Sequence, residues 1–193
     1  MLRKALYPKI ESLLNQTAGE LHKKGFTPNQ LTLAGLALNF VAGWIYSGGH
    51  LFWGGIFTLL AALGDMLDGP LARSTEKVTK FGAFLDSTVD RYSDFFIFGG
   101  LAIFYAHQSQ NFLLLLCMGT IAGAFVTSYS KARAENLIPQ CNVGIFERPE
   151  RIIIFAAGSV FWPLMPLALS ILFIGTNATA VHRILYTQQT LSD

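Results

Sequence analysis

Charged residues are scarce in this sequence, and their scarcity is its first structural clue. Of 193 residues only 13% are Asp, Glu, Lys or Arg, whereas 52% are hydrophobic. An average soluble domain is about 25% charged. With a mean hydropathy of +0.43, the composition excludes an ordinary soluble protein and indicates a chain that lies in lipid. The length allows one domain, so we expect a single membrane domain over residues 1–193.

Other absences narrow the classes of function. The net charge is only +2, and the sequence holds no basic run of the kind that follows nucleic-acid phosphates, so we expect no nucleic-acid partner. The two cysteines, Cys117 and Cys141, show neither disulfide nor metal-ligand spacing. The N-terminus lacks the apolar core of a signal peptide, because Lys9 and Glu11 interrupt it. The first apolar span is therefore expected to serve as the insertion signal.

Residues 1–25 are amphipathic rather than apolar. Leucines and Ile10 recur there at roughly helical spacing, with basic residues between them. This pattern predicts a helix that lies in the headgroup region of a membrane, with a solvated cap helix as the alternative. Gly25 is expected to end this helix. The next helix is expected to begin with a capping box, in which Thr27 is the N-cap, Pro28 takes the first helical position and Gln30 returns a hydrogen bond.

The rest of the chain, residues 26–193, alternates apolar stretches with short connections. Each long stretch approaches the roughly 20 residues that a bilayer span requires, and Pro163 and Pro166 suggest a turn between the last two. We predict six spans, at about residues 30–47, 51–72, 81–106, 111–134, 150–163 and 166–186. The expected fold class is an all-α integral membrane protein, with six transmembrane helices preceded by an amphipathic interfacial helix.

The distribution of basic residues sets the expected orientation. In the six-span scheme the connections at 48–50, 107–110 and 164–165 contain no Lys or Arg. Cytoplasmic loops carry the excess of Lys and Arg. Both termini and the basic connections are therefore expected on the cytoplasmic side of the inner membrane.

Carboxylates gather on two consecutive predicted spans. Asp65 and Asp68 lie three residues apart, and Asp86, Asp90 and Asp94 lie four apart, spacings that put side chains on one helix face. A charge deep in a bilayer costs about 2.5–3.5 kcal/mol even on a lenient scale, and neighbouring carboxylates repel one another. Hard divalent ions such as Mg²⁺ or Mn²⁺ would resolve that repulsion without His or Cys ligands. A polar helix contact or a proton relay is the alternative.

Small residues surround these carboxylates. Gly64, Gly69, Ala72 and Gly82 leave room for a phosphate or another backbone to approach closely. Ordinary packing of helices through small residues is the alternative. Arg73 closes the segment, where it could pair with a phosphate or simply reach the membrane edge.

Together the acidic and small residues form one spaced pattern, and it reads Asp65-x2-Asp68-Gly69-x2-Ala72-Arg73-x8-Gly82-x3-Asp86-x3-Asp90. The pattern resembles the signature of the CDP-alcohol phosphotransferase family at every fixed position. Six spans after an amphipathic helix also resemble the fold of that family, whose members are generally homodimers. The resemblance implies transfer of a phosphatidyl or other substituted phosphate group from a CDP-linked lipid, such as CDP-diacylglycerol, to a hydroxyl, with release of CMP.

The resemblance also implies a role for each residue. Asp65, Asp68, Asp86 and Asp90 would bind two divalent cations, Mg²⁺ or Mn²⁺, and Asp90 would also act as general base on the acceptor hydroxyl. Two such ions can stabilise both the attacking and the departing oxygens of an in-line displacement. The donor nucleotide would be bound by Asn29, Asp68, Gly69, Ala72, Arg73 and Gly82.

A second group of charged residues suggests the acceptor. Lys131, Arg133, Arg148 and Arg151 end the fourth predicted span and open the fifth. Guanidinium groups bind phosphate bidentately, which favours an acceptor that carries its own phosphate. A positive loop that touches lipid headgroups is the alternative.

The segments around these basic residues, and residues 86–94 before them, resemble the phosphatidylinositol-phosphate synthases and their archaeal-lipid relatives, which use inositol 1-phosphate. The members of the family that use glycerol phosphate more often carry proline where this chain has Ser87. Inositol 1-phosphate is thus the expected acceptor, and glycerol 3-phosphate is the second choice.

Two further classes of protein place carboxylates in membrane helices. A cation transporter would show cation-dependent transport without release of CMP. A membrane prenyltransferase also uses Asp-rich pairs with Mg²⁺, but it lacks the Gly69-x2-Ala72-Arg73 element that suits a nucleotide.

Overall fold

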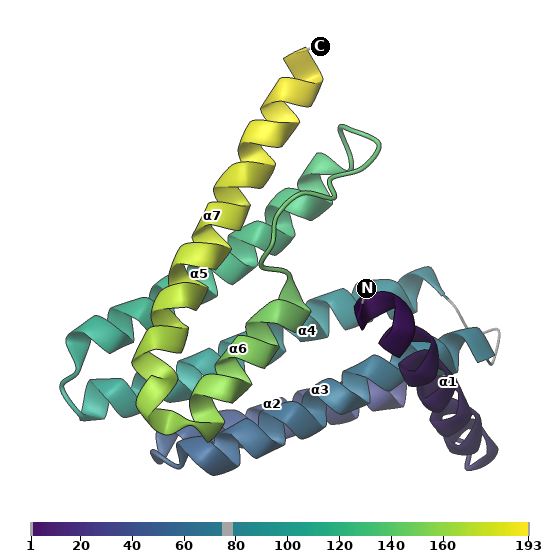
Figure 1. The fold of residues 1–193 in the computed structure, drawn as a ribbon, viewed down its shortest axis with the longest axis horizontal. Helices are drawn as coiled ribbons and strands as arrows, with labels where there is room; N and C mark the ends of the chain where they lie inside the picture. The colour runs from purple at the N-terminus through teal and green to yellow at the C-terminus, as the bar shows by residue number, and fades with distance from the viewer. Residues whose placement is uncertain (1, 75–78, 193) are drawn as a thin grey trace. The chain divides into compact units, whose positions relative to one another are not determined.

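The computed structural model describes residues 2–74 and 79–192. Every regular element in these residues is helical, which confirms the all-α prediction for the part of the chain described. The helices are α1 (Leu2–Lys23), α2 (Pro28–Ser47), α3 (Leu51–Ser74), α4 (Lys80–His107), α5 (Asn111–Ala134), α6 (Arg148–Val160) and α7 (Met165–Ser192), with a 3-10 turn at Trp162–Leu164 (Figure 1).

The chain divides into two compact units. Unit 1 comprises Met1–Leu38 and Leu60–Ser93, and unit 2 comprises Asn39–Leu59 and Asp94–Asp193. Unit 1 contains the predicted acidic signature, whereas unit 2 contains the predicted basic residues. The expectation of one domain over the whole chain stays a prediction.

The start of α2 confirms the predicted capping box. The Thr27 amide donates to Gln30 Oε1 at 2.9 Å, and the Gln30 amide donates to Thr27 Oγ1 at 3.4 Å. Just before it, Gly25 has a φ of +84°, a conformation that glycine adopts without steric cost and that commonly ends a helix. These two local signals fix where α1 ends and α2 begins.

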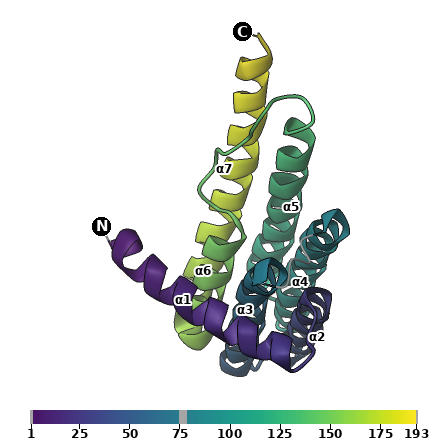
Figure 2. The same cartoon turned by 90° about the vertical axis from the view of Figure 1, so that its right-hand side faces the viewer.

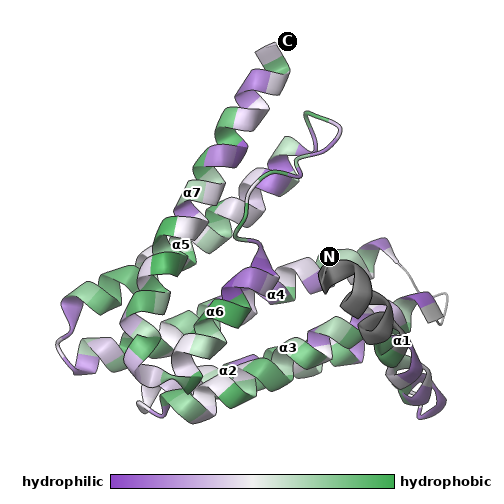
Figure 3. Cartoon of the chain, viewed as in Figure 1, coloured by the Kyte–Doolittle hydropathy of each residue, from purple (hydrophilic) through white to green (hydrophobic). Residues whose placement is uncertain are grey.

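Among the residues that the structure describes, three segments are long and apolar enough to cross a membrane: Leu51–Arg73, Asn111–Ala134 and Trp162–Ser192. Figure 3 shows hydrophobic residues along much of these helices and hydrophilic ones at the start of α6. The predicted spans match α2 to α7 closely, although α7 continues to Ser192. Helix α6 has 13 residues, or about 20 Å at a rise of 1.5 Å per residue, less than the roughly 30 Å apolar core of a bilayer. The count of six spans and the interfacial position of α1 remain predictions.

Close packing through small and polar residues holds unit 2 together. Helices α5 and α7 lie side by side in both views (Figures 1 and 2). The backbones of α2 and α4 meet at Gly43 and Gly100, where a Cβ on Gly100 would overlap the Gly43 carbonyl. The buried Tyr46 hydroxyl lies 2.8 Å from Ser159 Oγ and 3.3 Å from Thr58 Oγ1, which links α2, α6 and α3.

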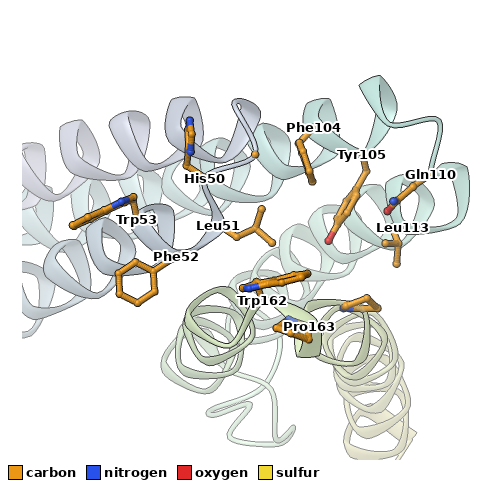
Figure 4. A pocket seen from close by; sticks show the side chains of 12 residues that line it. His50, Leu51, Phe52, Trp53, Phe104, Tyr105, Gln110, Leu113, Trp162 and Pro163 are labelled. Carbon is orange, nitrogen blue, oxygen red and sulfur yellow. The ribbon is translucent and has the colours of Figure 1, made fainter.

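A cavity of about 600 Å³ in unit 2 is lined from three helix connections. Gly49 belongs to the α2–α3 turn, Gln110 to the α4–α5 turn, and Trp162 and Pro163 to the α6–α7 turn. Figure 4 shows aromatic side chains, among them Tyr105 and Trp162, around this cavity. The three connections that lack Lys and Arg therefore lie together, as a chain that alternates direction from helix to helix requires.

Candidate active site

The acidic site of unit 1 is built on two helices. Asp65 and Asp68 lie on α3, Asp86 and Asp90 lie on α4, and all four are half-buried. The Thr32 hydroxyl of α2 donates to Asp68 Oδ2 at 3.0 Å. Asp68 lies close enough to Asp86 and Asp65 for both negative charges to act on it. The structure thus gathers like charges, as the spacing of three and four residues predicts.

A cavity of about 460 Å³ opens beside these carboxylates. Its volume falls within the range of about 300–1,000 Å³ that is typical of small-molecule sites. Its lining includes every residue predicted to bind the donor nucleotide, together with one further predicted metal ligand. These residues are Asn29, Asp68, Gly69, Ala72, Arg73, Gly82 and Asp86, and the remaining lining residues are Pro28, Thr32, Thr79 and Ala83.

Two helix N-termini border the same cavity. Pro28 and Asn29 open α2, while Thr79 precedes α4 and caps it, because the Gly82 amide donates to Thr79 Oγ1 at 2.9 Å. A Cβ on Gly82 would lie 3.1 Å from Thr79 Oγ1 and 3.5 Å from Asn29 Oδ1. Helix N-termini attract anions through their dipole and through the amides that no cap occupies. With Arg73 in the lining, this cavity suits a diphosphate.

The other two predicted ligands, Asp65 and Asp90, are not among the lining residues of this cavity. Asp65 packs against α2, since a Cβ on Gly35 would overlap its Oδ1. Asp90 Oδ2 lies 4.0 Å from Arg91 Nη1, and Arg91 also donates to the Ser87 carbonyl one turn earlier.

The donor set fits a hard divalent cation in its chemistry, because it consists of carboxylates without His or Cys. Among the described residues, no group of three or more His, Cys, Asp or Glu side chains is drawn together tightly enough to hold a metal ion. The carboxylates come from successive turns of α3 and α4.

The predicted basic residues lie in unit 2, and two of them meet Asp94. Arg151 Nη2 donates to Asp94 Oδ2 at 2.6 Å, with both side chains 3% exposed. Arg148 Nε lies 3.9 Å from Asp94 Oδ1, and Arg151 Nη1 also donates to the Phe146 carbonyl at 3.3 Å. Asp94, the last carboxylate of the stripe on α4, therefore anchors the first turn of α6.

A second group of contacts centres on Glu147. Lys131 Nζ donates to Glu147 Oε1 at 3.3 Å, and Arg183 Nη2 donates to the same oxygen at 2.8 Å. Arg133 is exposed, in the last turn of α5. The structure thus divides the four predicted basic residues: Arg148 and Arg151 lie with Asp94, Lys131 lies with Glu147, and Arg133 faces outward.

Sequence reasoning missed several residues that shape these sites. Thr32 and Gly35 contact the predicted metal ligands from α2, and nothing in the local sequence distinguishes them from ordinary span residues. Arg183 did carry a signal, because it falls inside the predicted span at 166–186 and an ionisable residue within a span is a candidate functional residue. Glu147 carried a weaker one, as an acidic residue beside Arg148.

Comparison with known proteins identifies the family of this chain. Residues 26–184 match the family model described as CDP-alcohol phosphatidyltransferase. The chain is 39% identical to a phosphatidylinositol phosphate synthase of Mycobacteroides abscessus over 95% of this chain and 86% of that protein. It is 40% identical to an archaetidylinositol phosphate synthase of Pyrococcus horikoshii over 80% of each chain.

Solved structures show the same fold. The crystal structure of Mycobacterium tuberculosis phosphatidylinositol phosphate synthase with CDP-DAG bound superposes with a TM-score of 0.84 at 32% identity, covering 91% of this chain and 94% of that one. The same enzyme in complex with manganese and citrate also gives a TM-score of 0.84, at 33% identity, covering 91% and 88%. The matched family model and these relatives place the chain among enzymes rather than transporters or prenyltransferases. This integral membrane protein therefore belongs to the CDP-alcohol phosphatidyltransferase family.

Proposed function

We propose that this enzyme transfers a phosphatidyl group from a CDP-linked lipid, CDP-diacylglycerol, to a hydroxyl of inositol 1-phosphate and releases CMP. The observation that carries the proposal is the cavity of unit 1, which gathers all six predicted donor-binding residues. The CDP-DAG bound to the similar M. tuberculosis enzyme supports the donor. The names of the relatives, which are phosphatidylinositol and archaetidylinositol phosphate synthases, support the acceptor.

The donor diphosphate would lie between the first turns of α2 and α4, with Arg73 beside it. Amide groups at those helix ends and the guanidinium favour negative charge. Part of the cavity lining consists of residues with a small side chain or none, Gly69, Ala72 and Gly82. A nucleotide can therefore approach the backbone closely there. Asn29, at the start of α2, would contact the cytosine or ribose end of the donor.

Asp65, Asp68, Asp86 and Asp90 would hold two divalent cations, Mg²⁺ or Mn²⁺, and the manganese complex of the M. tuberculosis relative supports the use of a divalent cation. When bound, such ions neutralise the charge of the diphosphate. Asp90 would take the proton of the acceptor hydroxyl as that oxygen attacks the β-phosphorus in line, and CMP would leave. Thr32 would orient Asp68 through its hydrogen bond to Oδ2.

The acceptor phosphate would bind the basic residues of unit 2. Lys131, Arg133, Arg148 and Arg151 supply the predicted cations, and Arg183 adds a guanidinium whose side chain is 3% exposed. Charge-assisted contacts to phosphate from fixed guanidinium groups are strong and directional. An acceptor with a phosphate of its own therefore suits this cluster better than a neutral alcohol.

The enzyme would function as a homodimer in the inner membrane, with both termini and the active site facing the cytoplasm. The clustering of the three uncharged connections around one cavity supports this orientation, because these connections then share the opposite side. Family resemblance supports the dimer.

The deciding experiment supplies purified protein with CDP-diacylglycerol and Mg²⁺ and measures release of CMP. Inositol 1-phosphate, glycerol 3-phosphate and unphosphorylated inositol are offered separately as acceptors. We expect turnover with inositol 1-phosphate. Faster turnover with glycerol 3-phosphate would show that glycerol 3-phosphate is the acceptor. Turnover with unphosphorylated inositol would show that the basic residues of unit 2 are not needed to bind an acceptor phosphate.

A further inference from the structure

Glu147 occupies the space between two cations in unit 2. Its Oε1 accepts hydrogen bonds from Lys131 Nζ at 3.3 Å and from Arg183 Nη2 at 2.8 Å. One carboxylate oxygen thus joins an ammonium and a guanidinium group, as an oxygen of a phosphate monoester would. Lys131 is one of the residues expected to bind the acceptor phosphate.

The orientation of Arg183 does not depend on Glu147. Arg183 Nε donates to the Val143 carbonyl at 2.9 Å, and Nη1 donates to the Thr127 carbonyl at 2.8 Å. Two main-chain acceptors therefore fix the plane of the guanidinium. The bond from Nη2 to Glu147 is the one of the three that an incoming anion can replace without moving the arginine.

Glu147 is held less firmly than the other carboxylate of this region. Its side chain is 49% exposed, and as the N-cap of α6 it has an extended backbone and makes no side-chain capping bond. Asp94, by contrast, is 3% exposed and bonded to Arg151 at 2.6 Å. A partly exposed ion pair contributes little stability, so Glu147 can leave its position at small cost, whereas Asp94 cannot.

We propose that the Glu147 carboxylate is a displaceable substitute for the acceptor phosphate, which replaces it between Lys131 and Arg183. The inference rests on the proposed function, since it requires a phosphorylated acceptor. An internal anion lowers the apparent affinity of the site by the fraction of molecules in which that anion has moved away. Free phosphate, which makes few other contacts, then seldom displaces the Glu147 carboxylate. An acceptor that makes further contacts still displaces it.

The test compares Glu147→Gln with Glu150→Gln in the full-length purified enzyme at fixed ionic strength. Glutamine keeps the size and one oxygen of Glu147 but removes its charge. Glu150 is exposed, lies three residues further along α6, and makes no ion pair among the described residues, so its substitution changes the net charge equally. Affinity for inorganic phosphate is measured by calorimetry, and KM and kcat are measured with inositol 1-phosphate.

For Glu147→Gln we expect inorganic phosphate to bind about two- to fivefold more tightly, given the modest strength of a partly exposed ion pair. The acceptor KM should fall by a similar factor while kcat is unchanged, and Glu150→Gln should match the wild type. Weaker phosphate binding or a raised KM would show that Glu147 positions the cations, and would overturn the proposal. Equal effects of the two substitutions would also overturn it, because general electrostatics would then suffice.

The failure of the proposed function is distinguishable from the failure of this exchange. If no phosphorylated acceptor releases CMP, the proposed function fails. Tighter binding of inorganic phosphate to Glu147→Gln, abolished by adding Lys131→Ala, would still support displacement of Glu147 by an oxyanion.

Discussion

The carboxylates of the two units have different kinds of partner. In unit 1, Asp68 lines a cavity within reach of the like charges of Asp65 and Asp86, and its described hydrogen-bond donors are neutral groups, the Thr32 hydroxyl and the Gly69 backbone amide. In unit 2, Asp94 is paired with the buried Arg151, and Glu147 bridges Lys131 and Arg183. Both regions draw carboxylates from helices, and one of those helices, α4, supplies both Asp86 and Asp94.

The carboxylates of unit 1 need cations from solution to balance their charge. The carboxylates of unit 2 are balanced by basic side chains of the protein itself. Gathered carboxylates repel one another and are costly within a membrane, so we expect the acidic region to be most stable with cations bound. A buried carboxylate with an arginine is already neutral as a pair, and removing one partner leaves an uncompensated charge. We therefore expect the acidic region to respond to ions and the basic region to respond to the acceptor.

Removal of divalent ions should have the largest effect, and it should act through the acidic region alone. We expect excess chelator to abolish release of CMP, because the diphosphate and the carboxylates of unit 1 would remain unneutralised. Added Mg²⁺ or Mn²⁺ should restore activity. If inorganic phosphate binds the basic residues of unit 2, its affinity should be the same in the chelated sample as in the presence of divalent ions. Full turnover in chelator would remove the two-metal assignment.

Substitution of Asp90 should separate proton transfer from donor binding. Asp90→Asn keeps size and one oxygen but cannot accept a proton, so we expect turnover to fall at least about 10²-fold, a typical general-base contribution. Donor affinity with metal present should be retained. Asp68→Asn should instead weaken donor binding, because Asp68 lines the cavity whereas Asp90 does not. Single-turnover rates and donor affinities are measured for both variants.

A near wild-type rate for Asp90→Asn would leave Asp90 as a ligand only. The base would then be another group, such as the phosphate of the acceptor itself.

Arg151 and Arg133 offer a contrast within the basic region. Both are predicted to bind the acceptor, yet Arg151 is buried against Asp94 and Arg133 is exposed. We expect either change to alanine to raise the acceptor KM about ten- to a hundredfold, the loss of one charge-assisted contact of roughly 1.5–3 kcal/mol, with little effect on donor KM. Arg151→Ala should also destabilise the fold by about 3–5 kcal/mol, as a broken buried ion pair does.

Thermal unfolding in detergent, alongside the two KM values, checks this contrast. Arg133→Ala should leave the unfolding temperature near that of the wild type. Equal changes of donor and acceptor KM would indicate that these arginines contribute to membrane orientation or folding and do not bind the acceptor.

The parts of the structure that follow from neighbouring residues were predictable. Thr27 and Gln30 form their capping box within four residues, and Gly25 ends α1 through its own backbone conformation. The shared face of Asp65 and Asp68 likewise follows from helical geometry. Each of these features depends on local spacing, which the sequence contains directly.

The contacts between helices distant in sequence were not predictable in the same way. Arg151 meets Asp94 across 57 residues, and Arg183 meets Glu147 across 36. Helical periodicity gives each helix a face but does not say which helix that face meets. For this reason the sequence predicts the basic residues as a group but does not predict their division between Asp94 and Glu147. The role of Arg183 and the contact of Gly35 with Asp65 required the packed structure.

The smallest predicted effect tests whether packing from α2 positions a metal ligand. A Cβ on Gly35 would overlap Asp65 Oδ1, whereas a Cβ on Gly64, next to Asp65 in the chain, would meet nothing within 4 Å. We expect Gly35→Ala to lower turnover roughly tenfold, because overpacking by one methyl costs about 1–3 kcal/mol and each step of about 1.4 kcal/mol is a factor of ten. Gly64→Ala should retain wild-type turnover, since it adds the same methyl to open space. The concentration of Mg²⁺ that gives half-maximal activity is measured for both, because a displaced Asp65 should raise it and a general folding defect should not. If Gly35→Ala and Gly64→Ala gave the same metal requirement, the carboxylate of Asp65 would not be held by α2, and the acidic region would be positioned by α3 and α4 alone.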